Sequence, residues 1–219
     1  MATQNRRPHY DADYFEWQRK SGEFCGLANR VKFEKFTSPE KSVLDFGCGG
    51  GFMLRNLTAK KRFGVEINPS ARKIAEKNGV SVFSKVEDVP DNSVDLIISD
   101  HALEHATHPL DELKSLRKKL KTGGQIVFVV PCEHVDYFYE PQDINQHLYS
   151  WSPMALGNLF TQAGFKVLSS KPFFHRHLPY SHRLRPLIGE KAFNLVCKIN
   201  GVLNRRRINE VQVIAEKPA

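Results

Sequence analysis

An acidic residue followed by glycines at alternate positions is the segment of this chain best suited to bind a ligand. Asp45 is followed by Gly47, Gly49 and Gly51. Glycines let the backbone turn sharply and bring a ligand close to main-chain N–H groups, which suits a nucleotide. The chain contains no GxxxxGK[ST] phosphate-binding string. The segment is not a GxGxxG dinucleotide loop either, because the third glycine is missing whether the pattern starts at Gly47 or at Gly49.

Two histidines follow another apolar run, Asp95–Asp100, and their rings are suited to acid–base chemistry. His101 and His105 stand on either side of Glu104. Because the unperturbed pKa of histidine is about 6.5, either ring is a candidate general base. Two other interpretations stay open: His105 is a structural residue, or all three side chains hold a divalent metal from one helix face. No further carboxylate is obviously recruited, so we expect no metal.

The elements that must position these residues alternate between strand and helix patterns. Strand-like apolar runs occur at Val43–Gly47, Arg62–Ile67, Val80–Ser84, Asp95–Asp100, Gln125–Pro131, Phe165–Phe173 and Ile208–Glu216. The helix patterns include Leu110–Leu120, which we expect Gly123-Gly124 to end, and a helix from Ser152-Pro153 to Gly164. Apolar strands separated by helices predict an α/β fold, with a doubly wound parallel sheet covered on both faces.

Two segments lie outside this pattern. Residues 9–36 are rich in aromatic residues and predict one or two helices over the domain, with Tyr14 and Trp17 either packed or forming a lid. Residues 174–207 predict a helical insertion before the last strand, with an amphipathic stretch around Leu195 to Leu203. This insertion carries eight basic residues and one acid, so +7 of the chain's formal charge of +8 falls within it. The charge indicates a localised anionic substrate, carrier or membrane contact rather than general nucleic-acid binding.

Several motifs in a fixed order resemble class I S-adenosylmethionine-dependent methyltransferases of the small-molecule, methyltransferase-11/23-like type. Asp45 and its glycines resemble motif I of that family, and Leu103-Glu104-His105 resembles the end of its fourth-strand motif. The remaining matches are Leu120–Val127, Gln146–Ser152 and Ala163–Phe165. The resemblance implies S-adenosylmethionine as cofactor and a Rossmann-like, mostly parallel sheet of seven strands.

The resemblance also implies the domain organisation and the cofactor residues. One methyltransferase domain is expected over residues 1–219, with the core at 42–173 and 208–217, the cap at 9–36 and the insertion at 174–207. The cofactor-binding residues are Asp45, Gly47, Cys48, Gly49, Gly51, Glu66, Ile67, Val86, Glu87 and Asp100. Glu66 would accept hydrogen bonds from both ribose hydroxyls. Lys85 replaces an aspartate that many relatives use for adenine, and because lysine cannot accept a hydrogen bond, the Val86 backbone with Glu87 or Asp88 would take that role.

Composition places the chain among globular proteins. Of its 219 residues 41% are hydrophobic and 26% charged. The cysteines Cys25, Cys48, Cys132 and Cys197 form no CxxC pair, so neither a thiolate zinc site nor a secreted disulfide framework is indicated. The first nine residues lack the apolar core of a signal peptide, and no apolar run approaches the roughly 20 residues of a membrane span. We therefore expect a cytoplasmic protein.

The expected function is methyl transfer from S-adenosylmethionine to a small-molecule, glycan or lipid-linked acceptor at a hydroxyl oxygen, with His105 or His101 as the catalytic group. The expected partners are an anionic acceptor and a peripheral membrane contact through residues 174–207, but not nucleic acid. An RNA or protein methyltransferase and a non-catalytic S-adenosylmethionine-binding regulator are the alternatives. Ser99–Ala102 differs from the Asn/Asp-Pro-Pro-Tyr/Phe string of base methyltransferases, which disfavours a nucleic-acid substrate.

Overall fold

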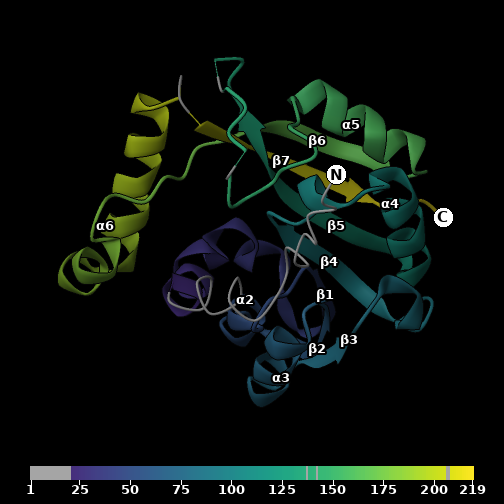
Figure 1. Ribbon diagram of the computed structural model, residues 1–219. Coiled ribbons are helices and arrows are strands. Elements are labelled where there is room, and N and C mark those ends of the chain that lie inside the picture. Colours follow the sequence, from purple (N-terminus) through teal and green to yellow (C-terminus); the bar gives the residue numbers. More distant parts are fainter. Residues whose placement is uncertain (1–20, 137, 142, 206–207) are drawn as a thin grey trace, which may run out of the picture.

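A seven-stranded sheet forms the centre of the molecule (Figure 1). This computed structural model describes residues 21–219 apart from 137, 142, 206 and 207. The strands are β1 (Ser38–Phe46), β2 (Ala59–Val65), β3 (Ser81–Phe83), β4 (Val94–Asp100), β5 (Leu120–Glu133), β6 (Lys166–Phe173) and β7 (Ile208–Glu216). Their order is β3-β2-β1-β4-β5-β7-β6, and β7 alone runs opposite to the other six strands. The predicted mostly parallel sheet is therefore confirmed.

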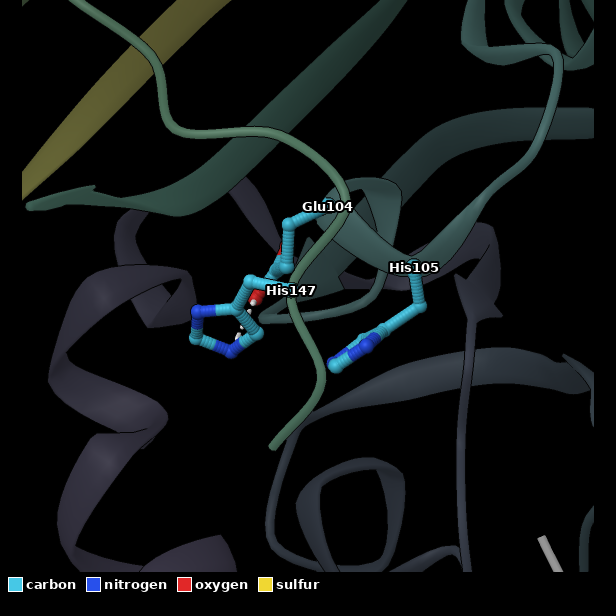
Figure 2. Close-up of side chains that lie close together, drawn as sticks. All are labelled: Glu104, His105 and His147. Atoms are coloured by element: carbon cyan, nitrogen blue, oxygen red, sulfur yellow. Dashed lines mark ion pairs between the residues drawn. The ribbon is translucent and has the colours of Figure 1, made fainter. Parts of the chain in front are cut away.

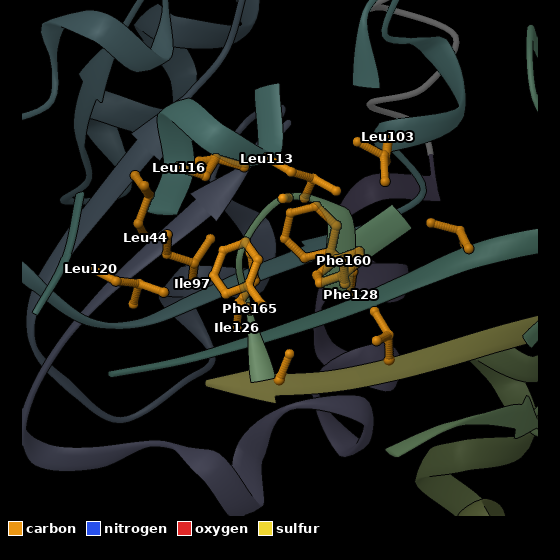
Figure 3. Packing of buried hydrophobic residues seen from close by; sticks show 14 of the residues in the cluster. Leu44, Ile97, Leu103, Leu113, Leu116, Leu120, Ile126, Phe128, Phe160 and Phe165 are labelled. Atoms are coloured by element: carbon orange, nitrogen blue, oxygen red, sulfur yellow. The ribbon is translucent and has the colours of Figure 1, made fainter. Parts of the chain in front are cut away.

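Helices cover both faces of this sheet (Figure 1). They are α2 (Phe52–Arg55), α3 (Pro69–Lys77), α4 (Pro109–Lys119), α5 (Pro153–Gln162) and α6 (Ser181–Leu203), with 3-10 turns η1 (Asn29–Lys32), η2 (Glu34–Phe36), η3 (Val86–Asp88) and η4 (Leu103–His105). Successive strand residues point to opposite faces. In β4, Ile97 therefore packs in the core beneath α4 and α5, while Leu96 and Ile98 pack beneath α2 and α3. Figure 3 shows the first of these cores, where the rings of Phe128 and Phe160 meet edge to face with centroids 5.6 Å apart.

The glycine pair after α4 does not end that helix, contrary to the sequence-based expectation. The helix ends at Lys119, and Leu120 is already extended, with φ −69° and ψ 139°. Gly123 lies inside β5 with φ +74°, where its N–H donates to the carbonyl of Lys217 over 3.0 Å. The pair therefore shapes the start of the strand, because a positive φ is easily adopted by glycine.

The described part of the cap packs against the insertion. Residues 21–28 are helical and lead into η1 and η2. Ala28 is buried with Phe193 and Cys197 of α6, and α6 itself is interrupted at Gly189, whose φ is +75°. The two expected helical segments therefore lie side by side, whereas Tyr14 and Trp17 fall outside the described residues.

Helix α6 has apolar residues on two opposite faces. Phe193, Cys197 and Gly201 recur every four residues and are buried. Leu195 and Ile199, by contrast, are 59% and 49% exposed. The apolar stretch predicted from the sequence thus faces away from the domain. Among the described residues, no helix combines the length and the apolar character that crossing a bilayer requires.

Candidate active site

The glycine loop follows β1 directly and depends on backbone angles that favour glycine. Gly47 and Gly51 have φ of +77° and +72°. A Cβ atom on Gly47 would lie 2.4 Å from the Cβ of Ala102, so this loop touches the segment that follows β4. The helix that follows the loop, α2, is short and ends at Arg55. The backbone of the glycine loop therefore turns sharply here and passes close to the segment after β4.

Glu66, at the end of β2, joins this loop to the next helix. Its Oε2 accepts from the Gly49 N–H over 2.9 Å, and its Oε1 accepts from the Asn68 N–H over 2.7 Å. Burial raises the pKa of Glu66, and these two backbone donors oppose that rise. Each carboxylate oxygen has a second lone pair. Glu66 can therefore hold the loop and still accept from the two hydroxyls of a ribose, as the sequence predicts.

Asp45 and Asp100 end the neighbouring strands β1 and β4. Asp45 is buried, and burial, followed by the charges of Asp100 and Glu66, raises its pKa well above the ordinary value. Asp100 accepts from the Asn29 amide over 3.0 Å and from the Lys32 ammonium over 2.8 Å. The three carboxylates thus face one edge of the sheet, with η1 supplying a counter-charge.

The other residues predicted to bind the cofactor differ in exposure. The Val86 side chain is buried in the core, while Ile67 is 59% exposed at the end of β2. Glu87 is exposed but engages α4, because its carboxylate accepts from the Ser115 hydroxyl over 3.4 Å. The Cys48 side chain is buried within the glycine loop. Contacts of these residues with a cofactor stay predictions.

His101 is held between two carboxylates. Its φ of +58° places it outside η4, with Nε2 2.8 Å from Glu210 Oε1 and Nδ1 3.3 Å from Glu104 Oε1. Burial alone would lower the pKa of His101, but Glu104 and Glu210 raise it to about 10. The single helix face that would have gathered His101, Glu104 and His105 does not form, since residues 103–105 make only a 3-10 turn.

His105 instead faces a histidine from a later loop. The rings of His105 and His147 lie with centroids 5.0 Å apart, next to the buried Glu104 (Figure 2). His147 Nδ1 lies 2.6 Å from Glu133 Oε1 at the end of β5, and the Leu148 N–H donates to the Glu104 carbonyl over 2.9 Å. The loop before α5 is thereby attached to η4, and it brings a second imidazole to the end of β4.

This arrangement, a bent glycine loop, an acidic β2 end and polar groups after β4, is matched by a known family. Residues 16–170 match the family described as a methyltransferase domain. The chain belongs to this family. S-adenosylmethionine is its cofactor, and Glu66 with the glycine loop provides acceptors and close backbone approach of the kind this nucleoside requires.

Several known proteins are similar to this methyltransferase domain, and their names state different acceptors. The ubiquinone biosynthesis O-methyltransferase of Roseobacter denitrificans is 23% identical, covering 80% of this chain and 87% of that protein. The tRNA U34 carboxymethyltransferase of Shewanella amazonensis is 29% identical over 62% of this chain, but the match spans only 43% of that protein. The structure of Haemonchus contortus phosphoethanolamine N-methyltransferase 2, which holds S-adenosylhomocysteine, has a TM-score of 0.65 at 13% identity, covering 97% of this chain and 61% of that one. This last likeness concerns the fold.

Sequence reasoning about this methyltransferase domain missed Lys32 and Glu210. The Lys32 side chain is 2% exposed, and its ammonium lies 2.8 Å from both Asp100 and Glu210. Burial would lower the pKa of Lys32, but the two carboxylates raise it. Glu210, whose pKa burial would raise, is instead lowered to about 2, chiefly by Lys32 and His101. The only local signal was a lysine placed between the apolar residues Val31 and Phe33.

Proposed function

We propose that this domain transfers the methyl group of S-adenosylmethionine to a hydroxyl oxygen of a small-molecule or lipid-linked acceptor. The observation that carries the proposal is the pair of imidazoles, His105 and His147, at the carboxyl end of β4. Both rings lie on the edge of the sheet that also holds Glu66 and the glycine loop. A hydroxyl acceptor needs a group that removes its proton, whereas an amine acceptor can react unprotonated.

The reaction requires little covalent chemistry from the chain. When bound, S-adenosylmethionine supplies the methyl group as part of a sulfonium. The acceptor oxygen bonds to the methyl carbon, the electron pair of the carbon–sulfur bond returns to sulfur, and the hydroxyl proton passes to an imidazole. His105 is the candidate for that proton, because both nitrogens of His101 already face carboxylates. Glu66 and the glycine loop position the cofactor, and alignment of the reacting atoms alone can contribute about 7–11 kcal/mol.

The surface of α6 supports a lipid-linked acceptor. After the break at Gly189, Leu195, Ile199 and Leu203 are exposed, and Lys191 and Lys198, seven residues apart in the same helical segment, are exposed as well. The acid of this helix, Glu190, is occupied by Arg30 and Arg185. An apolar stripe bordered by basic residues is the pattern of a helix that lies on an anionic membrane. We therefore propose that α6 contacts such a surface, where a lipid-linked acceptor would be found.

A tRNA acceptor is the second candidate, because the matched tRNA U34 carboxymethyltransferases and the basic side chains of α6 favour it. The test is incubation of the purified protein with methyl-labelled S-adenosylmethionine and fractionated cell extract. We expect label in the lipid or soluble-metabolite fraction, with S-adenosylhomocysteine as the co-product. Label confined to RNA would overturn the acceptor class, and the absence of label from all fractions, with the cofactor still bound, would favour a regulatory protein.

A further inference from the structure

The carboxylate of Glu104 is buried and, among the described residues, lacks the hydrogen bonds that such a group normally has. Its side chain is 0% exposed. Within the described residues, neither of its oxygens accepts a hydrogen bond of good geometry. Its neighbours are imidazoles, with His147 Nε2 3.9 Å away and His101 Nδ1 3.3 Å away. The charged His101 ring offsets part of the charge at Oε1, but neither oxygen is hydrogen bonded within the described part of the chain, so the buried carboxylate keeps lone pairs that a metal could use.

Two histidines complete a set of three ligand atoms around that carboxylate. One nitrogen each of His105 and His147 and one oxygen of Glu104 lie within 4.8 Å of one another. In Figure 2 both rings approach each other below Glu104, one from η4 and one from the loop before α5. Ligands at the 2.0–2.2 Å typical of zinc sites stand about 3.3 Å apart, so a small closure of this group would complete the site.

His147 is already oriented as a metal-binding histidine. Its Nδ1 lies 2.6 Å from Glu133 Oε1, while its Nε2 is directed toward Glu104. A carboxylate that accepts a hydrogen bond from Nδ1–H fixes the ring tautomer and leaves Nε2 unprotonated for a metal. The 2.9 Å hydrogen bond from the Leu148 N–H to the Glu104 carbonyl keeps the loop in this position.

We propose that Glu104, His105 and His147 bind one divalent first-row transition metal of the zinc class, with Glu133 orienting His147. Two imidazoles and one carboxylate favour such an ion over magnesium or calcium, which prefer oxygen ligands. This ligand set differs from the one considered from the sequence, in which His101 took the place of His147, because the His101 ring is turned toward Glu210. The second acidic group of the described chain, Asp100, His101 and Glu210, needs no metal, since the Lys32 ammonium lies between its two carboxylates.

Three protein ligands leave a tetrahedral metal one open position. The use of that position in catalysis rests on the proposed methyl transfer to a hydroxyl, but it replaces His105 as the base in the metal-bound chain. An oxygen of the acceptor would occupy the position, its pKa would fall, and its proton would pass to water, while His105 and His147 act as ligands. Binding itself is independent of methyl transfer.

Direct metal binding tests the site. The full-length chain is treated with a chelator and then titrated with Co²⁺, monitored by visible absorption, and with Zn²⁺, monitored by calorimetry. We expect one ion per chain and intense absorption bands of four-coordinate Co²⁺. His147→Ala and Glu104→Gln should abolish these bands, whereas His108→Ala and His134→Ala should leave them unchanged, because both residues are exposed and outside the group.

A milder variant keeps the test valid if ligand variants fail to fold. Glu133→Gln retains all three ligands and should weaken metal affinity about 10- to 100-fold. Absence of binding to the folded wild-type chain, or binding that is equal in the wild type, His147→Ala and Glu133→Gln, would overturn the site. Failure of the proposed function looks different: the metal would bind as described while no fraction of the extract receives a methyl group.

Discussion

The backbone N–H of Gly49 donates a hydrogen bond to the carboxylate of Glu66 over 2.9 Å, so the glycine loop after β1 is attached to the acidic end of β2. The two parts of the cofactor site are therefore a single unit even though they come from different strands. A change at Glu66 should affect both the ribose contacts and the shape of the loop.

Glu66→Ala should weaken binding of S-adenosylhomocysteine about 10- to 100-fold, because hydrogen bonds to a charged group contribute roughly 1.5–3 kcal/mol each. Calorimetric titration of the folded variant measures the effect. Glu76→Ala is the matched control, since Glu76 is an exposed glutamate of the following helix. Equal affinity of Glu66→Ala and the wild type would contradict the role of Glu66.

Gly47→Ala should destabilise the domain more than Gly79→Ala does. Both glycines have a positive φ, +77° and +79°, so both variants incur the left-handed backbone cost of about 1–2 kcal/mol. Only a Cβ on Gly47 meets another atom, 2.4 Å from the Cβ of Ala102, whereas nothing lies within 4 Å at Gly79. The difference between the two melting temperatures reports the steric contact. Equal melting temperatures would show that the loop adapts.

The sequence predicts the sheet well because the pattern of each strand is local. The alternation that buries Leu96, Ile97 and Ile98 in two cores follows from the short apolar run itself. The end of α4 was harder to predict. The extended conformation of Leu120 competes with the helix there, and a glycine pair inside a strand looks like a glycine pair that ends a helix.

The candidate site could be predicted only in part, because its contacts join distant segments. Glu66 and the glycines follow from motifs at strand ends. The approach of Lys32 to Glu210 spans 178 positions, and the approach of His147 to Glu133 depends on the path of one loop. His101 turns toward Glu210 because its φ is positive, which cannot be predicted from the residue type.

His105→Ala should lower turnover about 100- to 10,000-fold and leave S-adenosylhomocysteine affinity unchanged, because it removes the proposed base or metal ligand but neither Glu66 nor the glycine loop. The comparison uses kcat with the acceptor identified by labelling and affinity by calorimetry. His108→Ala, three residues further on and exposed, serves as the control. Turnover equal to that of the control would assign His105 a purely structural role.

Acidification should destabilise the contact between the cap and the insertion through His177. Its ring packs against Phe24, His175 and Phe193, and within the described residues its Nε2 is buried without a hydrogen-bond partner. Burial lowers the pKa of His177 to about 4, with His175 and Lys32 acting in the same direction and Glu210 and Asp100 opposing.

The unfolded chain, with a histidine pKa of about 6.5, binds this proton more readily than the folded chain. Stability should therefore fall as the pH decreases from about 6.5 to 4. His177→Phe should reduce the fall in melting temperature over this interval, while His134→Phe, at an exposed position, should not. Identical pH profiles for His177→Phe and the wild type would exclude this contribution.

The exposed stripe of α6 should bind anionic vesicles. Leu195 and Ile199 lie on the side of the helix opposite the buried Phe193 and Cys197, so substitution there leaves the packed face intact. Leu195→Glu combined with Ile199→Glu should abolish co-sedimentation with vesicles of phosphatidylglycerol and phosphatidylcholine, because it removes apolar area and adds charge that anionic lipid repels. Met154→Glu, on the exposed surface of α5, controls for the added charge. Binding that persists in the double variant, or that is equal on vesicles of phosphatidylcholine alone, would contradict the proposed contact between this apolar stripe and an anionic surface.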